Sequence, residues 1–138
     1  MADALRDKFD LQRKACLASP EVPWARRADR LHRLKRLVAD NAAAFAQAIS
    51  HDFGHRSAHE TDLLEVFPSL SGINHALSHG KRWMRGEWRA TGKWFLPASS
   101  RVMPQPLGVA GIIVPWNYRC ILPQARSPRR WLQATGRW

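Results

Sequence analysis

The sequence has few of the residues that mark secreted, metal-binding or membrane proteins. Its two cysteines, Cys16 and Cys120, lie far apart and form neither a CxxC pair nor a metal-ligand spacing, so no disulfide framework and no metal site are expected. No run of about 18 apolar residues occurs, which excludes a transmembrane helix. The charged, amphipathic start lacks the apolar core and cleavage site of a signal peptide. We therefore expect a cytoplasmic protein with no membrane partner.

Acidic residues are also scarce, and the formal net charge is +11. Residues 1–118 hold 17 Lys and Arg against 11 Asp and Glu, whereas residues 119–138 hold five Arg and no acid. Such a charge is typical of nucleic-acid binding, and the Trp- and Arg-rich residues 81–94 could stack on bases. Packing of these tryptophans against the next element is the favoured interpretation. Because almost half of the excess charge lies in residues 119–138, we expect no nucleic-acid partner. A small basic nucleic-acid-binding or interaction module is the alternative function.

Hydrophobic periodicity predicts helices over the first half of the chain. Residues 3–18 carry a loose apolar stripe, and residues 24–50 carry the clearest one, with a basic run at positions 26–36 mainly between its apolar residues. This run is interpreted as a solvated face and not as a phosphate site. The capping-box pattern Ser57-x-x-Glu60 predicts a third helix, kinked at Pro68 and ending near Gly80 or Gly86.

Histidines recur at a spacing of four, at positions 51, 55 and 59 and again at 75 and 79. On one helix face such pairs can bind zinc. Gly54 and the Ser57 cap interrupt the first set, and no cysteine or carboxylate completes either set. We therefore interpret them as structural or solvated histidines.

The periodicity changes after the helices. Residues 109–114 form a short apolar run, bounded by Gly108 and Pro115, that predicts a buried strand of an α/β sheet. Three helices followed by such a strand indicate the beginning of an α/β domain.

The stretch Pro-Leu-Gly-Val-Ala-Gly-Ile-Ile-Val-Pro-Trp-Asn-Tyr at residues 106–118 closely resembles the aldehyde dehydrogenase superfamily. Residues 52–61, 63–68 and 94–97 are similar to its coniferyl aldehyde dehydrogenase branch. The resemblance covers residues 1–118. It implies an α/β fold: N-terminal helices plus the first strands of an incomplete, Rossmann-like NAD-binding domain.

The resemblance also implies a chemistry and a site. In the family, a cysteine thiolate attacks the aldehyde, a hydride leaves to NAD or NADP, and water hydrolyses the resulting thioester to the acid. Asn117 matches the asparagine that stabilises the developing oxyanion as an uncharged N–H donor. Ile113, Val114, Pro115 and Trp116 match residues that lie along the cofactor. From the residues alone, Asn117 also fits a turn or cap and Trp116 also fits core packing.

Other parts of the family's machinery have no match in this sequence. Neither Cys16 nor Cys120 matches the catalytic cysteine, and neither Glu65 nor Glu87 matches the general-base glutamate. The resemblance implies an aldehyde substrate, NAD or NADP, and an oligomer for the intact family. For this chain we expect inactivity alone, no bound cofactor and a tendency to aggregate.

Residues 119–138 depart from the family pattern, which needs proline after Tyr118 and then an Ala- and Leu-rich helix ending in Ala-Gly-Asn-Arg. The chain instead continues Arg-Cys-Ile-Leu-Pro and is basic, proline-interrupted and aperiodic. Back-translated with GC-rich codons and read from one nucleotide earlier, the same stretch permits the family continuation. We therefore predict two segments: residues 1–118 are the N-terminal part of an aldehyde dehydrogenase domain, and residues 119–138 are an out-of-frame, disordered or irregular tail.

Overall fold

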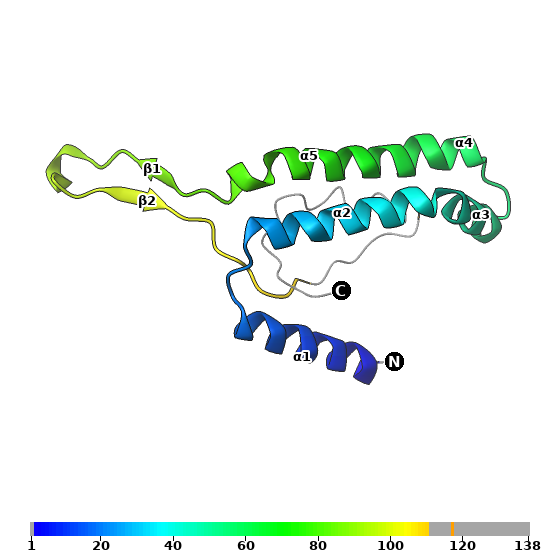
Figure 1. Ribbon diagram of the computed structural model, residues 1–138, viewed down its shortest axis with the longest axis horizontal. Helices are drawn as coiled ribbons and strands as arrows, with labels where there is room; N and C mark the ends of the chain where they lie inside the picture. The colour runs from blue at the N-terminus through cyan, green and yellow to red at the C-terminus, as the bar shows by residue number, and fades with distance from the viewer. Residues whose placement is uncertain (1, 111–116, 118–138) are drawn as a thin grey trace.

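The computed structural model describes residues 2–110 and residue 117, which form a helical body and one projecting hairpin (Figure 1). Helices and strands both occur, as the sequence predicted, with one small two-stranded sheet in the part of the chain described. In chain order the elements are α1 (Ala2–Ala18), α2 (Trp24–Asp40), α3 (Ala42–Phe53), α4 (Ala58–Thr61), the π-helix η1 (Asp62–Val66), α5 (Phe67–Trp83), β1 (Glu87–Arg89), the 3-10 helix η2 (Lys93–Phe95) and β2 (Ser100–Val102).

The core lies between α2 and α5, which run side by side in opposite directions (Figure 1). Leu31 and Val38 of α2 pack with Val66, the last residue of η1, and with Ile73 and Ala76 of α5. Each larger aliphatic side chain buried in this way contributes about 1.5–3 kcal/mol. This antiparallel pair therefore supplies most of the apolar stabilisation seen in the described residues.

The single helix predicted over residues 24–50 is wrong, because the chain breaks at Asn41. Asn41 leaves helical geometry with φ −110° and ψ 13°, and α3 then sets off in a new direction (Figure 1). Its side-chain Nδ2 donates a hydrogen bond to the carbonyl oxygen of Leu37 at 2.8 Å. A short amide side chain that bonds the backbone competes with helix continuation, and the apolar period does not reveal this competition.

The third predicted helix is confirmed at its beginning, where Ser57 is extended and Ala58 opens α4, although Ser57 makes no side-chain cap bond. The helical path continues to Trp83, between the two glycines proposed as its end. Directly before Pro68 the chain widens into the π-helix η1. Proline has no N–H for the usual backbone bond, and a π turn is one way in which a helix accommodates that loss.

The hairpin formed by β1 and β2 extends away from the helices (Figure 1). The strands are antiparallel, with Trp88 opposite Arg101, and the Arg101 guanidinium carbon lies 5.6 Å from the centre of the Trp88 ring. Trp83 packs on the core, but Trp88 is exposed and Trp94 is 96% exposed. The expectation that these tryptophans pack against the next element is therefore wrong for Trp94, whereas Trp88, although exposed, lies against Arg101 of the facing strand.

The strand predicted over residues 109–114 lies mostly outside the described residues. Val109 and Ala110 are described and have no regular secondary structure. The predicted parallel strand is therefore not among the elements that the structure describes.

Candidate functional site

The sequence-predicted site residues differ in what the structure says of them. Asn117 lies in a turn and its side chain is exposed. Ile113, Val114, Pro115 and Trp116 lie outside the described residues. The grouping of these five residues around a cofactor and a substrate oxygen stays a prediction.

The chain that leads into residues 111–118 passes close to α1 at Gly108. Gly108 has φ +86°, a left-handed conformation that side chains other than glycine rarely adopt. A Cβ built at this position would lie 3.8 Å from the Sγ of Cys16 in α1. That distance is an ordinary van der Waals contact, so the positive φ is the reason for glycine here, and the half-buried Cys16 lies beside the start of the motif.

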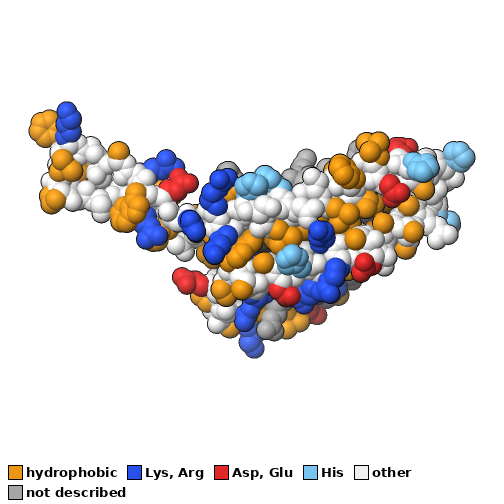
Figure 2. Space-filling view, turned by 45° about the horizontal axis from the view of Figure 1, so that its top comes forward, with side chains coloured by type: hydrophobic (Ala, Val, Ile, Leu, Met, Phe, Trp, Pro, Cys, Tyr) orange, Lys and Arg blue, Asp and Glu red, His pale blue; other side chains and the backbone are white. Residues whose placement is uncertain are grey.

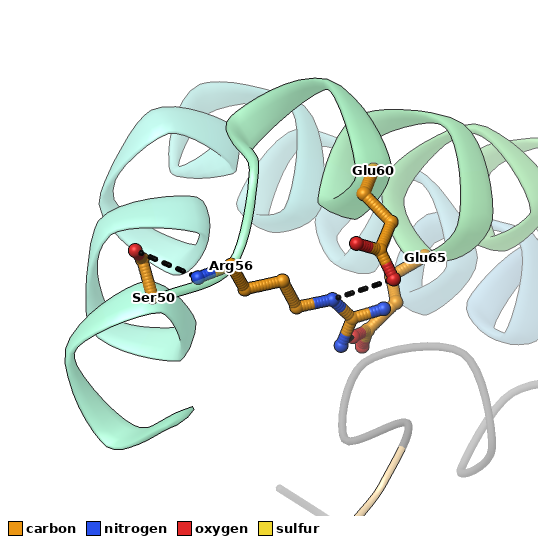
Figure 3. A network of polar contacts seen from close by, with 4 residues as sticks. All are labelled: Ser50, Arg56, Glu60 and Glu65. Carbon is orange, nitrogen blue, oxygen red and sulfur yellow. Dashed lines mark hydrogen bonds and ion pairs between the residues drawn. The ribbon is translucent and has the colours of Figure 1, made fainter. Parts of the chain in front are cut away.

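A polar network, which sequence reasoning did not find, ties the loop after α3 to the following helix (Figure 3). The Arg56 Nη1 donates to the Glu65 Oε1 at 2.9 Å, and the Arg56 Nε lies 3.4 Å from the Glu60 Oε1. The Arg56 backbone N–H donates to the Ser50 hydroxyl at 3.3 Å. The Glu65 side chain is fully buried and the Arg56 side chain is 8% exposed. This geometry holds a carboxylate in a fixed ion pair and supports a structural role for Glu65.

The network continues a stripe of buried polar side chains. Thr61, Glu65 and Ser69 recur at a spacing of four and are all buried. Within the described residues, the Thr61 and Ser69 hydroxyls have no hydrogen-bond partner. The spacing of four could have indicated from the sequence that these polar residues share one helix face. It could not have shown that Arg56 is the partner of Glu65.

The histidines that recur at a spacing of four lie on different elements in one set and on one helix in the other. His51 lies in α3, His55 in the following loop and His59 in α4, so the first set does not share one helix, as expected. His75 and His79 stack with ring centres 4.1 Å apart, and the His79 Nδ1 lies 3.0 Å from the His75 carbonyl oxygen. Over residues 2–110, no group of three or more His, Cys, Asp or Glu side chains is arranged to hold a metal ion.

The described helices also include none that is long and apolar enough to cross a bilayer. Many apolar side chains are nevertheless exposed. Figure 2 shows several on the projecting hairpin, and the exposed set there includes Trp88, Trp94, Phe95 and Leu96.

Comparison with known proteins assigns the segment to a family. The aldehyde dehydrogenase family model matches residues 4–128, and the chain belongs to that family. The matched range runs past the boundary predicted at residue 118, and that boundary stays a prediction.

Individual relatives include coniferyl aldehyde dehydrogenases and a member of aldehyde dehydrogenase family 3. Over 114 residues, the chain is 46% identical to a probable coniferyl aldehyde dehydrogenase of Pseudomonas aeruginosa, covering 83% of this chain and 24% of that protein. It is 35% identical over 121 residues to a coniferyl aldehyde dehydrogenase of a Pseudomonas species, covering 88% and 25%. It is 30% identical over 116 residues to aldehyde dehydrogenase family 3 member B1 of Rattus norvegicus, covering 84% and 25%. The chain thus spans about a quarter of the length of these curated relatives.

Proposed function

We propose that this chain corresponds to the N-terminal quarter of an NAD(P)-dependent aldehyde dehydrogenase, and that the aldehyde is coniferyl aldehyde or a related aromatic aldehyde. The observation that carries the proposal is the 46% identity to a probable coniferyl aldehyde dehydrogenase over 83% of the chain. The motif at residues 106–118 lies within the range that the family model matches and places the family's asparagine pattern at Asn117. The same resemblance supports an oligomeric, cytoplasmic whole protein.

Asn117 is the residue to which we assign a catalytic role. When a thiolate attacks an aldehyde carbon, negative charge develops on the former carbonyl oxygen. The Asn117 amide N–H is a donor that stabilises this charge and has no proton to lose near neutral pH. Its exposed position in a turn leaves the amide accessible to a partner group.

The residues assigned to the cofactor do not fit a complete dinucleotide. Ile113, Val114 and Trp116 offer apolar or aromatic surfaces for a ring, and Pro115 lacks an N–H. A pyrophosphate needs N–H groups or positive charge, commonly at a glycine turn and a helix N-terminus. When bound, NAD(P) supplies the hydride acceptor. We expect no tight binding of NAD(P) by this chain.

The purified 138-residue chain is expected to give no aldehyde-dependent NADH formation, since neither of its cysteines matches the family's nucleophile. Turnover by this chain that exceeds a heat-treated control would contradict the expectation. A chimera tests whether residues 1–118 support aldehyde oxidation within a full-length enzyme. In this chimera, residues 1–118 replace the matching region of the Pseudomonas aeruginosa relative.

The chimera allows a direct test of Asn117. Asn117→Ala is expected to lower kcat by about 100- to 1000-fold, because that is the usual cost of losing one oxyanion donor. Asn74→Ala, at an exposed asparagine of α5, is the matched control and is expected to leave kcat unchanged. An active chimera in which both variants keep full kcat would remove Asn117 from the mechanism without removing the family assignment.

A further inference from the structure

A cavity of about 640 Å³ lies where the hairpin leaves the helical body. The N-terminal end of α2 and the residues before it line one side, and the end of α5 with both ends of the hairpin line the other. Figure 2 shows Lys and Arg side chains gathered at this junction. The volume falls within the range of about 300–1,000 Å³ that is common for small-molecule sites.

Arg27 is the buried charge in this cavity. Arg27 is 6% exposed, and its Nε donates to the carbonyl oxygen of Val22 at 2.9 Å. Its Nη1 is buried and has no hydrogen-bond partner among the described residues. Burial lowers the pKa of Arg27, and the neighbouring Arg30 lowers it further. A buried guanidinium with an unused donor is costly unless an acceptor takes that hydrogen bond, and an anion would also balance the buried positive charge.

The surroundings add positive charge. Arg27 lies in the first turns of α2, whose first turn contains no acidic residue to offset the positive end of the helix dipole. Arg85 and Arg101 line the same cavity from the α5 end and the hairpin. Glu21 and Glu87 also line it, and the Glu87 Oε2 forms an ion pair with the Arg89 Nη2 at 2.7 Å. The lining therefore holds three arginines and two glutamates, and this small excess of positive charge favours a monoanion over a dianion.

Apolar side chains complete the lining. Trp83, Met84 and Met103 face the cavity together with several prolines. These groups suit a hydrophobic or aromatic body, whereas a planar guanidinium suits the two oxygens of a carboxylate. The cavity thus offers a charged surface for the carboxylate and an apolar surface for the ring of one ligand.

We propose that this cavity binds a small aromatic carboxylate, with the carboxylate on Arg27 and the ring against Trp83 and the two methionines. Charge-assisted hydrogen bonds contribute about 1.5–3 kcal/mol, which corresponds to about 10- to 150-fold in affinity. A neutral analogue of the same shape is therefore expected to bind at least about tenfold more weakly.

The test uses the full chain and benzoate, with benzamide as the uncharged control and inorganic phosphate as a competing anion. Calorimetry is expected to show saturable binding of benzoate, weak binding of benzamide and little competition by phosphate. Arg27→Met is expected to abolish binding, and Arg26→Met, at the exposed neighbouring position, is expected to leave it intact.

Because Arg27→Met could disturb the fold, a second measurement follows the unmodified chain. The Arg27 side-chain Nε–H signal in ¹⁵N NMR is expected to shift on titration with benzoate and to stay in place with benzamide. Equal binding of benzamide, equal binding of phosphate, equal losses in the Arg26 and Arg27 variants, or an unchanged Arg27 signal would each overturn the proposal.

Discussion

Replacing Arg56 with methionine tests whether the buried ion pair holds the helices together. The change removes the partner of Glu65 at 2.9 Å while keeping a long apolar stem. Glu65 is fully buried, so the variant leaves a carboxylate without its guanidinium in a site with no access to solvent. Removing one partner of a buried pair costs about 3–5 kcal/mol. This is a large fraction of the total stability of about 5–15 kcal/mol that is usual for a domain.

The measurement is urea unfolding followed by circular dichroism at a helix-sensitive wavelength. With a slope of about 1–3 kcal/mol per M urea, a loss of this size lowers the midpoint by at least about 1 M. The matched control is Arg33→Met, which removes the pair between Arg33 and Asp29 at 3.0 Å, whose side chains are 60% and 61% exposed. Exposed pairs contribute about 0–1 kcal/mol, so the control midpoint should move little.

The double variant Arg56→Met with Glu65→Leu separates two explanations. If the loss of stability comes from a buried Glu65 carboxylate that has lost the Arg56 guanidinium, replacing both partners with apolar groups restores much of the stability. If the cost instead comes from poorer packing of methionine at position 56, the double variant stays as weak as the single one. Equal midpoints for Arg56→Met and the Arg33 control would refute the assignment of a stabilising role to this network.

Three further predictions concern the backbone, at two glycines, and the charge of the chain. Gly108→Ala should destabilise the chain by about 1–3 kcal/mol, because its φ of +86° is strained for alanine. Gly72→Ala should stabilise it by up to about 1 kcal/mol, because Gly72 is helical and a Cβ there meets no atom within 4 Å; thermal unfolding of both variants checks the opposite signs. Binding to generic duplex DNA should be weak and should disappear when residues 119–138 are deleted, as measured by fluorescence anisotropy at two salt concentrations. Salt-dependent binding that survives the deletion would favour a basic binding module.

The helices could be predicted because their apolar residues recur with the helical period. The break at Asn41 could not, because it depends on a side-chain bond to the Leu37 carbonyl that leaves the apolar period almost intact. The first strand of the hairpin, β1, was missed for a different reason. The residues of β1 are exposed on both faces, so the alternation of buried and exposed residues that marks a strand does not arise.

The candidate sites divide in the same way. Asn117 was found through a motif that is continuous in sequence. Arg56 and Glu65 are nine residues apart, and only the turn after α3 and the π-helix bring them within hydrogen-bond distance. Arg27 looked like one of several basic residues on a solvated helix face, and the structure instead buries it beside a cavity. The charge pattern of the helix could not show which arginine is buried, and burial is what distinguishes Arg27 from its neighbours.

The exposure of Asn117 also limits what this chain can do chemically. A hydrogen bond formed in competition with water contributes only about 0.5–1.5 kcal/mol net. A preorganised oxyanion donor in a site that excludes water contributes about 2.7–4 kcal/mol. Because Asn117 is exposed, a hydrogen bond from its amide competes with water and contributes the smaller of these two amounts. The catalytic role that we propose for Asn117 therefore requires additional protein that covers it. This requirement explains why the chimera should respond to Asn117→Ala while the 138-residue chain alone should show no activity to lose.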